Sequence, residues 1–73
     1  MTIKLAFKAA DSKSTMVFTW EGGEILKQYN GKAWGRFQLP EAPAGVAAFE
    51  QICRKRFLLS QKWQCTALVG VAA

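Results

Sequence analysis

The chain has 73 residues, of which 51% are hydrophobic and 12% aromatic, and its formal net charge is +5. This length gives room for one small domain, residues 1–73, and the apolar content argues against a disordered chain. No apolar run approaches the roughly 18 residues of a membrane span, and the N-terminus lacks the apolar stretch of a signal peptide. We therefore expect a cytoplasmic protein without a membrane partner.

Four stretches before residue 40 have the composition of β-strands, because β-branched and aromatic residues are frequent in them. The predicted strands are Thr2–Lys8, Thr15–Trp20, Ile25–Tyr29 and Lys32–Leu39. Asn30-Gly31 separates the last two strands. This dipeptide favours a two-residue type I′ turn, in which both central residues have positive φ. The sequence therefore predicts a hairpin around residues 30 and 31.

The two faces of this predicted hairpin differ in chemistry. With a two-residue turn, Tyr29 pairs with Lys32, Lys27 with Trp34, and Ile25 with Arg36. Alternation then places a basic and aromatic set on one face, here called the basic hairpin face: Lys27, Tyr29, Lys32, Trp34 and Arg36. The opposite face is expected to join the core, and it carries Leu26, Ala33, Gly35, Phe37 and Leu39.

The turn at Gly22-Gly23 has two interpretations. A two-residue loop pairs Trp20 with Ile25 and puts the large apolar side chains of Thr15–Trp20 on the basic hairpin face. A three-residue loop with a bulge pairs Trp20 with Leu26 and sends those side chains into the core, because a shift of one residue exchanges the faces. We favour the three-residue loop, since it buries Trp20.

The period becomes helical after Pro43, and we expect a helix over Ala44–Gln61. Half of its circumference forms an apolar stripe made of Val46, Phe49, Ile52, Cys53, Phe57 and Leu59. The other half carries Arg54, Lys55, Gln61 and Lys62, while Arg56 falls inside the apolar arc and extends its charged end out of it.

A last strand is expected over Gln64–Val71, which is apolar on both faces as a central strand would be. The order is four strands, one helix and one strand. This pattern predicts an α+β fold, in which an antiparallel sheet of about five strands carries the single helix on one face.

The residue types present argue against catalysis. The chain has no histidine, so Cys53 and Cys65 lack the usual activating base, and their spacing does not fit a zinc site. Gly22-Gly23 is too short for a phosphate loop. We therefore expect no enzymatic activity, no metal or other cofactor and no small-molecule substrate, with both thiols free and reduced.

Trp34 and Arg36 have a functional and a structural interpretation of similar weight. An exposed Trp34 can stack on a base or on a duplex end, and Arg36 can hold a phosphate. Alternatively, Trp34 packs against the stems of the neighbouring lysines in cation–π contacts. The candidate binding residues are Lys27, Tyr29, Lys32, Trp34 and Arg36, together with Arg54, Lys55 and Lys62 of the helical region. The expected partner is nucleic acid or an acidic protein surface.

Trp34-Gly35-Arg36 is the tripeptide after which the WGR domain is named, and the chain resembles that family. Ala48-Phe49, Phe57 and Lys62-Trp63 are similar to the family's helix pattern, although Phe37–Pro40 departs from the Val-Gly and Gly-Gln that follow its tripeptide. WGR domains occur in DNA-dependent poly(ADP-ribose) polymerases and as a small bacterial module. The resemblance implies an antiparallel sheet with one helix, and Trp34 and Arg36 in contact with the end of a DNA duplex.

A protein partner is the alternative. A small basic chain without recognisable catalytic residues resembles, in its size and its lack of motifs, the phage or mobile-element inhibitors that block a host complex, including anti-CRISPR proteins. Trp and Arg dominate the energetics of protein interfaces, so the basic hairpin face would serve such a partner equally well.

Overall fold

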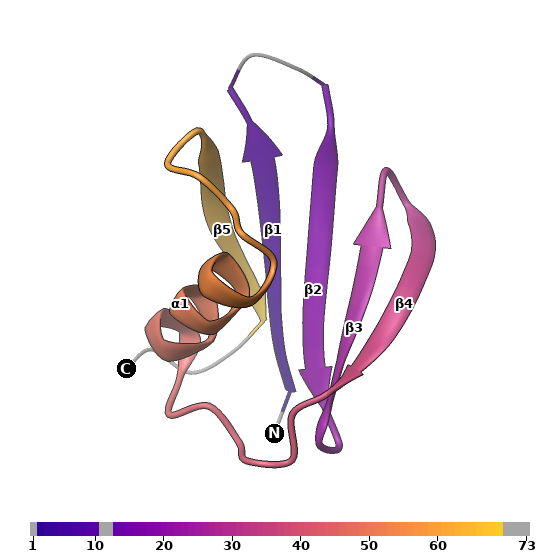
Figure 1. The fold of residues 1–73 in the computed structure, drawn as a ribbon, viewed down its shortest axis with the longest axis vertical. Helices are drawn as coiled ribbons and strands as arrows, with labels where there is room; N and C mark the ends of the chain where they lie inside the picture. Colours follow the sequence, from indigo (N-terminus) through magenta and orange to yellow (C-terminus); the bar gives the residue numbers. More distant parts are fainter. Residues whose placement is uncertain (1, 11–12, 70–73) are drawn as a thin grey trace.

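The computed structural model describes residues 2–10 and 13–69, and these residues form one antiparallel sheet and one helix (Figure 1). The elements are β1 (Thr2–Ala9), β2 (Thr15–Glu21), β3 (Glu24–Tyr29), β4 (Lys32–Gln38), α1 (Val46–Arg56) and β5 (Trp63–Val69). The spatial order of the strands is β4-β3-β2-β1-β5, and α1 packs on one face of the sheet against β1. The predicted α+β fold and order of elements are confirmed.

The core lies between α1 and the sheet. Every second residue of β1 and β2 is buried, as expected when side chains of a strand alternate between a covered and an open face. Phe7 and Phe18 meet edge to face, with their ring centroids 5.5 Å apart. The buried apolar residues are Ile3, Leu5, Phe7, Ala9, Met16, Phe18, Trp20, Ile25, Phe49 and Cys53.

The turn between β2 and β3 has two residues, so the predicted three-residue loop is wrong. Gly22 and Gly23 have φ of 60° and 83°, and Trp20 pairs with Ile25. Both glycines supply the positive φ of a tight hairpin turn. Trp20 is buried without a bulge at this turn, because its face of the sheet is the core face, where its partner Ile25 is also fully buried.

The helix is shorter at both ends than the predicted range Ala44–Gln61. It begins after Gly45 and ends near Phe57, because Leu58 adopts a left-handed φ of 55°. Leu59 N–H then donates to the Arg54 carbonyl at 2.8 Å, which is the closing bond of a Schellman motif. The predicted apolar stripe is confirmed as the side of α1 that packs on the core. No helix among residues 2–10 and 13–69 is long and apolar enough to span a membrane.

β5 is an edge strand, so the prediction of a central last strand is wrong. It pairs antiparallel with β1, from Ala9–Trp63 to Lys4–Val69. β1 is therefore an interior strand, because it pairs with β2 on its other side. Residues 70 and 71, which the predicted strand included, lie outside the described part of the chain.

Cys53 of α1 and Cys65 of β5 both have free thiols, and their charges interact. Burial, followed by the charge of Cys65, raises the pKa of Cys53 from its ordinary 9.0 to about 12. Burial, followed by the charge of Glu50 and a hydrogen bond to it, raises the pKa of Cys65 to about 11. Few thiolates therefore form near neutral pH.

We expect both thiols to resist alkylation at pH 8 in the native protein and to react once the protein unfolds. Mass spectrometry of the unreduced protein should show no loss of two hydrogens. Because both pKa values are raised by folding, the stabilising contribution of the neutral thiols is complete below pH 9 and is lost as the pH rises towards 12. Rapid alkylation of native protein at pH 8 would contradict this.

Candidate functional site

The β3–β4 hairpin contains a β-bulge that the sequence did not predict. The observed pairs are Tyr29–Lys32, Gln28–Ala33, Lys27–Gly35, Leu26–Arg36 and Ile25–Phe37. Trp34 falls between two of these pairs and is the extra residue of the bulge. The turn at Asn30-Gly31 is the predicted one, since these residues have φ of 51° and 83°.

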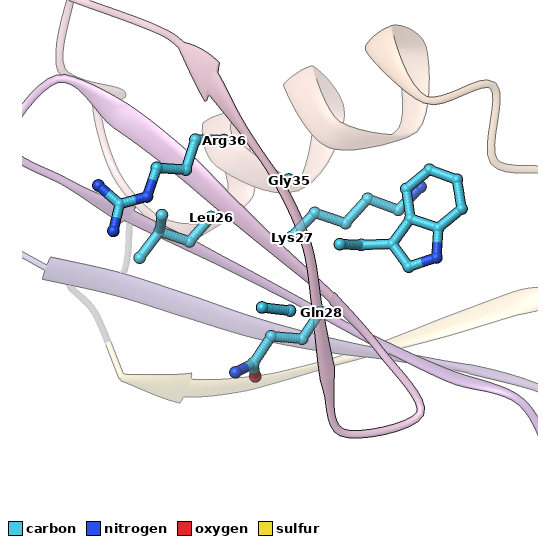
Figure 2. Close-up of a pocket in the computed structure, with 7 residues that line it drawn as sticks. Leu26, Lys27, Gln28, Gly35 and Arg36 are labelled. Atoms are coloured by element: carbon cyan, nitrogen blue, oxygen red, sulfur yellow. The ribbon is translucent and has the colours of Figure 1, made fainter.

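The bulge moves Arg36 off the basic hairpin face, so the prediction that it lies beside Lys27 and Trp34 is wrong. Arg36 pairs with Leu26, and both lie on the face of the sheet away from α1. Figure 2 shows Leu26, Gln28 and Arg36 on one side of the hairpin and Lys27 on the other. The prediction that Leu26 and Ala33 face the core is also wrong, because the two-residue turn at Gly22-Gly23 puts Ile25, and not Leu26, on the same face as Trp20.

The ammonium group of Lys27 lies among three aromatic rings. Its Nζ is 4.6 Å from the centroid of the Trp34 ring, 5.2 Å from that of Phe57 and 6.0 Å from that of Phe18. Cation–π attraction of this kind contributes about 0.5–2 kcal/mol, depending on how far water is excluded. Lys27 thereby connects the hairpin to the end of α1. The sequence pattern did not predict this contact between Lys27 and Phe57.

Trp34 is the most exposed aromatic residue in the described part of the chain, with 64% of its surface accessible. Lys27 lies against its ring, on the side of the sheet that carries α1. Tyr29 and Lys32 form the neighbouring pair and are also exposed. The structure thus brings together four of the predicted site residues, Lys27, Tyr29, Lys32 and Trp34, and we call this group the hairpin site.

The tip of the hairpin is held by hydrogen bonds to the start of β2. Asn30 Oδ1 accepts from Thr15 N–H at 2.9 Å, and Asn30 N–H donates to the Thr15 carbonyl at 2.9 Å. Tyr29 Oη and Ser14 Oγ are 3.1 Å apart. These bonds limit the movement of the tip, so the hairpin site is carried by an anchored turn rather than by a loose loop.

Two arginines of the helical region hold segments of the fold together through hydrogen bonds. Arg54 donates through Nε to Glu50 at 2.9 Å, through Nη1 to the Ser60 carbonyl at 3.1 Å and through Nη2 to the Trp63 carbonyl at 2.8 Å. Its predicted place on the solvated half of the helix is therefore wrong. Arg56 donates to the Gln38 carbonyl at 2.8 Å and ties α1 to the end of β4.

Lys55 and Lys62 are exposed on α1 and in the turn before β5. Lys62 precedes the β5 edge of the sheet, whereas the hairpin site lies at the β4 edge. These two lysines therefore do not join the hairpin site, and the predicted eight-residue set divides into separate groups.

A hollow of about 420 Å³ lies beside the bulge (Figure 2). It is lined by Leu26, Lys27, Gln28, Ala33, Trp34, Gly35 and Arg36. The space lies where Trp34 and Gly35 of β4 together oppose the single residue Lys27 of β3.

Among residues 2–10 and 13–69, no three His, Cys, Asp or Glu side chains cluster so that they could hold a metal ion. The hairpin site itself consists of two amines, an indole and a phenol. Comparison with models of known protein families, with curated proteins and with solved structures gave no match for this chain.

Proposed function

We propose that this protein is a non-catalytic binding module that binds nucleic acid, DNA in the first instance, through the hairpin site. The observation that carries this proposal is the exposed indole of Trp34 with a lysine ammonium 4.6 Å from its ring centroid. An aromatic platform flanked by cations is the usual arrangement for binding unpaired bases and their phosphates.

Lys27 prepares Trp34 for stacking. Its ammonium group attracts the ring from one side and is itself held by the rings of Phe57 and Phe18. The indole is therefore oriented before the ligand arrives, and less side-chain entropy is lost on binding than for a freely rotating tryptophan. Lys27 is a positioning residue in this account, and Lys32 supplies the phosphate contact.

The charge distribution favours a polyanion over a neutral partner. The chain carries ten Lys and Arg against five Asp and Glu. Within the described residues, the ion pair between Arg54 and Glu50 is the one that forms, so most of the positive charge stays without a local acid. The remaining cations attract phosphates over about one Debye length, roughly 8 Å at physiological salt.

Stacking on Trp34 requires a base that is not already covered on both faces. We therefore expect single strands and open duplex ends to bind better than the interior of a duplex. The WGR-like tripeptide points to duplex ends, but Arg36 lies on the opposite sheet face from Lys27, so our proposal assigns the contact to Trp34 and Lys32.

Salt-titrated binding of the Lys32→Ala and Arg36→Ala variants tests this assignment. Each variant removes one exposed cation of the same hairpin, but from opposite faces. Lys32→Ala should lower the slope of log affinity against log salt by about 0.7 for a single strand or 0.9 for a duplex, because one phosphate contact is lost. Arg36→Ala should leave the slope nearly unchanged.

Equal slope changes in the two variants would show that the partner does not distinguish the two faces of the hairpin. Weak binding of every nucleic acid form, with tight binding to an isolated acidic protein, would favour the inhibitor alternative. Either result would overturn the proposal.

A further inference from the structure

The two edges of the sheet differ in their suitability for pairing with another strand. β4 carries Lys32 and Arg36, and its bulge at Trp34 lies in the middle of the strand; charges and bulges on an edge discourage strand addition. β5 also has a bulge, but it lies at Leu68, after the stretch from Trp63 to Ala67 that pairs regularly with β1. β5 has no charged residue from Trp63 to Val69. Leu68 and Val69 are 52% and 50% exposed. β5 is therefore the edge of the described sheet that is chemically open to another strand.

The ladder between β1 and β5 indicates which backbone groups of this edge are available. Hydrogen-bonded and non-hydrogen-bonded residues alternate along an antiparallel strand. The Lys62 carbonyl accepts a bond of 3.3 Å from the residue that follows β1. Gln64 and Thr66, two and four residues further on, thus bond to β1. Cys65 and Ala67 then direct their N–H and C=O groups away from the sheet.

Trp63 would also face outward, but its backbone groups are used within the chain. Its N–H donates to the Ser60 carbonyl at 3.2 Å, and its carbonyl accepts from Arg54 at 2.8 Å. The groups that need a partner strand are therefore those of Cys65 and Ala67.

We propose that β5 pairs antiparallel with β5 of a second copy of this chain, with Thr66 on the two-fold axis. In this register Cys65 of each copy exchanges both backbone hydrogen bonds with Ala67 of the other, which gives four bonds. Thr66 lies opposite Thr66 of the second copy, a favourable cross-strand pair. The pairing joins two sheets into one and leaves the hairpin site at the far edge of each copy.

Charge favours this edge for two identical basic chains. Pairing β4 with a second β4 would bring Lys32 and Arg36 against the same cations, and like charges opposite each other destabilise a sheet. Across paired β5 strands, the nearest cations of the sheet are Lys4 and Lys8 on β1. They are separated from those of the second copy by three strand spacings, about 14 Å, which exceeds the Debye length at physiological salt.

Sedimentation of the wild type and of Thr66→Lys over a wide concentration range tests the proposal. The wild type should form a concentration-dependent dimer. Thr66→Lys places two lysines directly opposite each other at the axis, and it should weaken dimerisation about ten-fold or more. Gln64→Lys is the matched control, because it adds the same charge to the same face, and its two lysines are four residues apart along the paired strands, about 14 Å, rather than directly opposite each other.

Mixing two variants tests the register itself. Thr66→Lys and Thr66→Glu should each be impaired alone, because like charges meet on the axis, and their equimolar mixture should associate as a heterodimer. Thermal melts of each variant confirm that it folds. In the wild type, the amide protons of Cys65 and Ala67 should gain protection from exchange as the concentration rises.

A wild type that stays monomeric at every concentration would overturn the proposal. So would a dimer that Thr66→Lys and Gln64→Lys affect equally, or an equimolar mixture that does not associate. None of these results bears on nucleic-acid binding at the hairpin site, which lies at the other edge.

Discussion

Phe49→Ala is expected to lower the free energy of unfolding by about 3–5 kcal/mol, because the ring is fully buried between α1 and the sheet. A domain of this length has a total stability of roughly 4–11 kcal/mol, so this loss removes a large part of it. Chemical denaturation monitored by circular dichroism provides the measurement. The midpoint should fall well below that of the wild type, or the variant should be largely unfolded without denaturant.

Leu58→Ala is the matched control for this prediction. Leu58 follows the same helix but is 89% exposed, so its truncation should change the free energy of unfolding by less than about 0.5 kcal/mol. Equal midpoints for Phe49→Ala and wild type would show that the buried face of α1 is assigned wrongly.

Arg54→Ala is expected to lower the free energy of unfolding by about 2–3 kcal/mol, although surface arginines usually contribute little. Its guanidinium donates to two backbone carbonyls and to Glu50, and its central carbon is 5.3 Å from the centroid of the Phe7 ring. Its removal leaves the carbonyls of Ser60 and Trp63 without this donor. The melting temperature and the denaturation midpoint should both fall.

Lys55→Ala separates this structural role from a general loss of charge. Lys55 is the next residue of α1 and is exposed, so its removal should change stability by less than about 0.5 kcal/mol. Arg54→Lys should recover only part of the loss, because an ammonium group cannot donate to three partners with the planar geometry of a guanidinium. If Arg54→Ala were as stable as Lys55→Ala, the hydrogen bonds from Arg54 to the turn before β5 would contribute nothing measurable to the free energy of unfolding.

The sequence predicted the elements of the fold because hydrophobic period and turn residues are local signals. The alternation of β1 and β2, the turn at Asn30-Gly31 and the apolar stripe of α1 are all confirmed. The position of β5 depends instead on which strand pairs with β1, and no local pattern encodes that choice. The end of α1 depends on a left-handed Leu58, and leucine disfavours this conformation.

The candidate site was predicted in part, and the wrong placement of Arg36 has one physical cause. Two tight hairpin turns with regular pairing would place Phe37 on the opposite face from Phe18 and Trp20, although all three are apolar. An extra residue was therefore needed in one of the two hairpins. The sequence favours Gly22-Gly23 for this extra residue, because glycine makes a bulge easy, whereas the structure has it at Trp34. This single shift separates Arg36 from Trp34.

The most direct test of the central claim compares Trp34→Ala with the wild type in two measurements, affinity for a single-stranded oligonucleotide and melting temperature. The account predicts a loss of binding of about 1–3 kcal/mol, or roughly 5- to 150-fold, with the melting temperature nearly unchanged, because Trp34 is 64% exposed. A lower melting temperature with unchanged affinity would show that Trp34 only packs against Lys27, and it would contradict the proposed function.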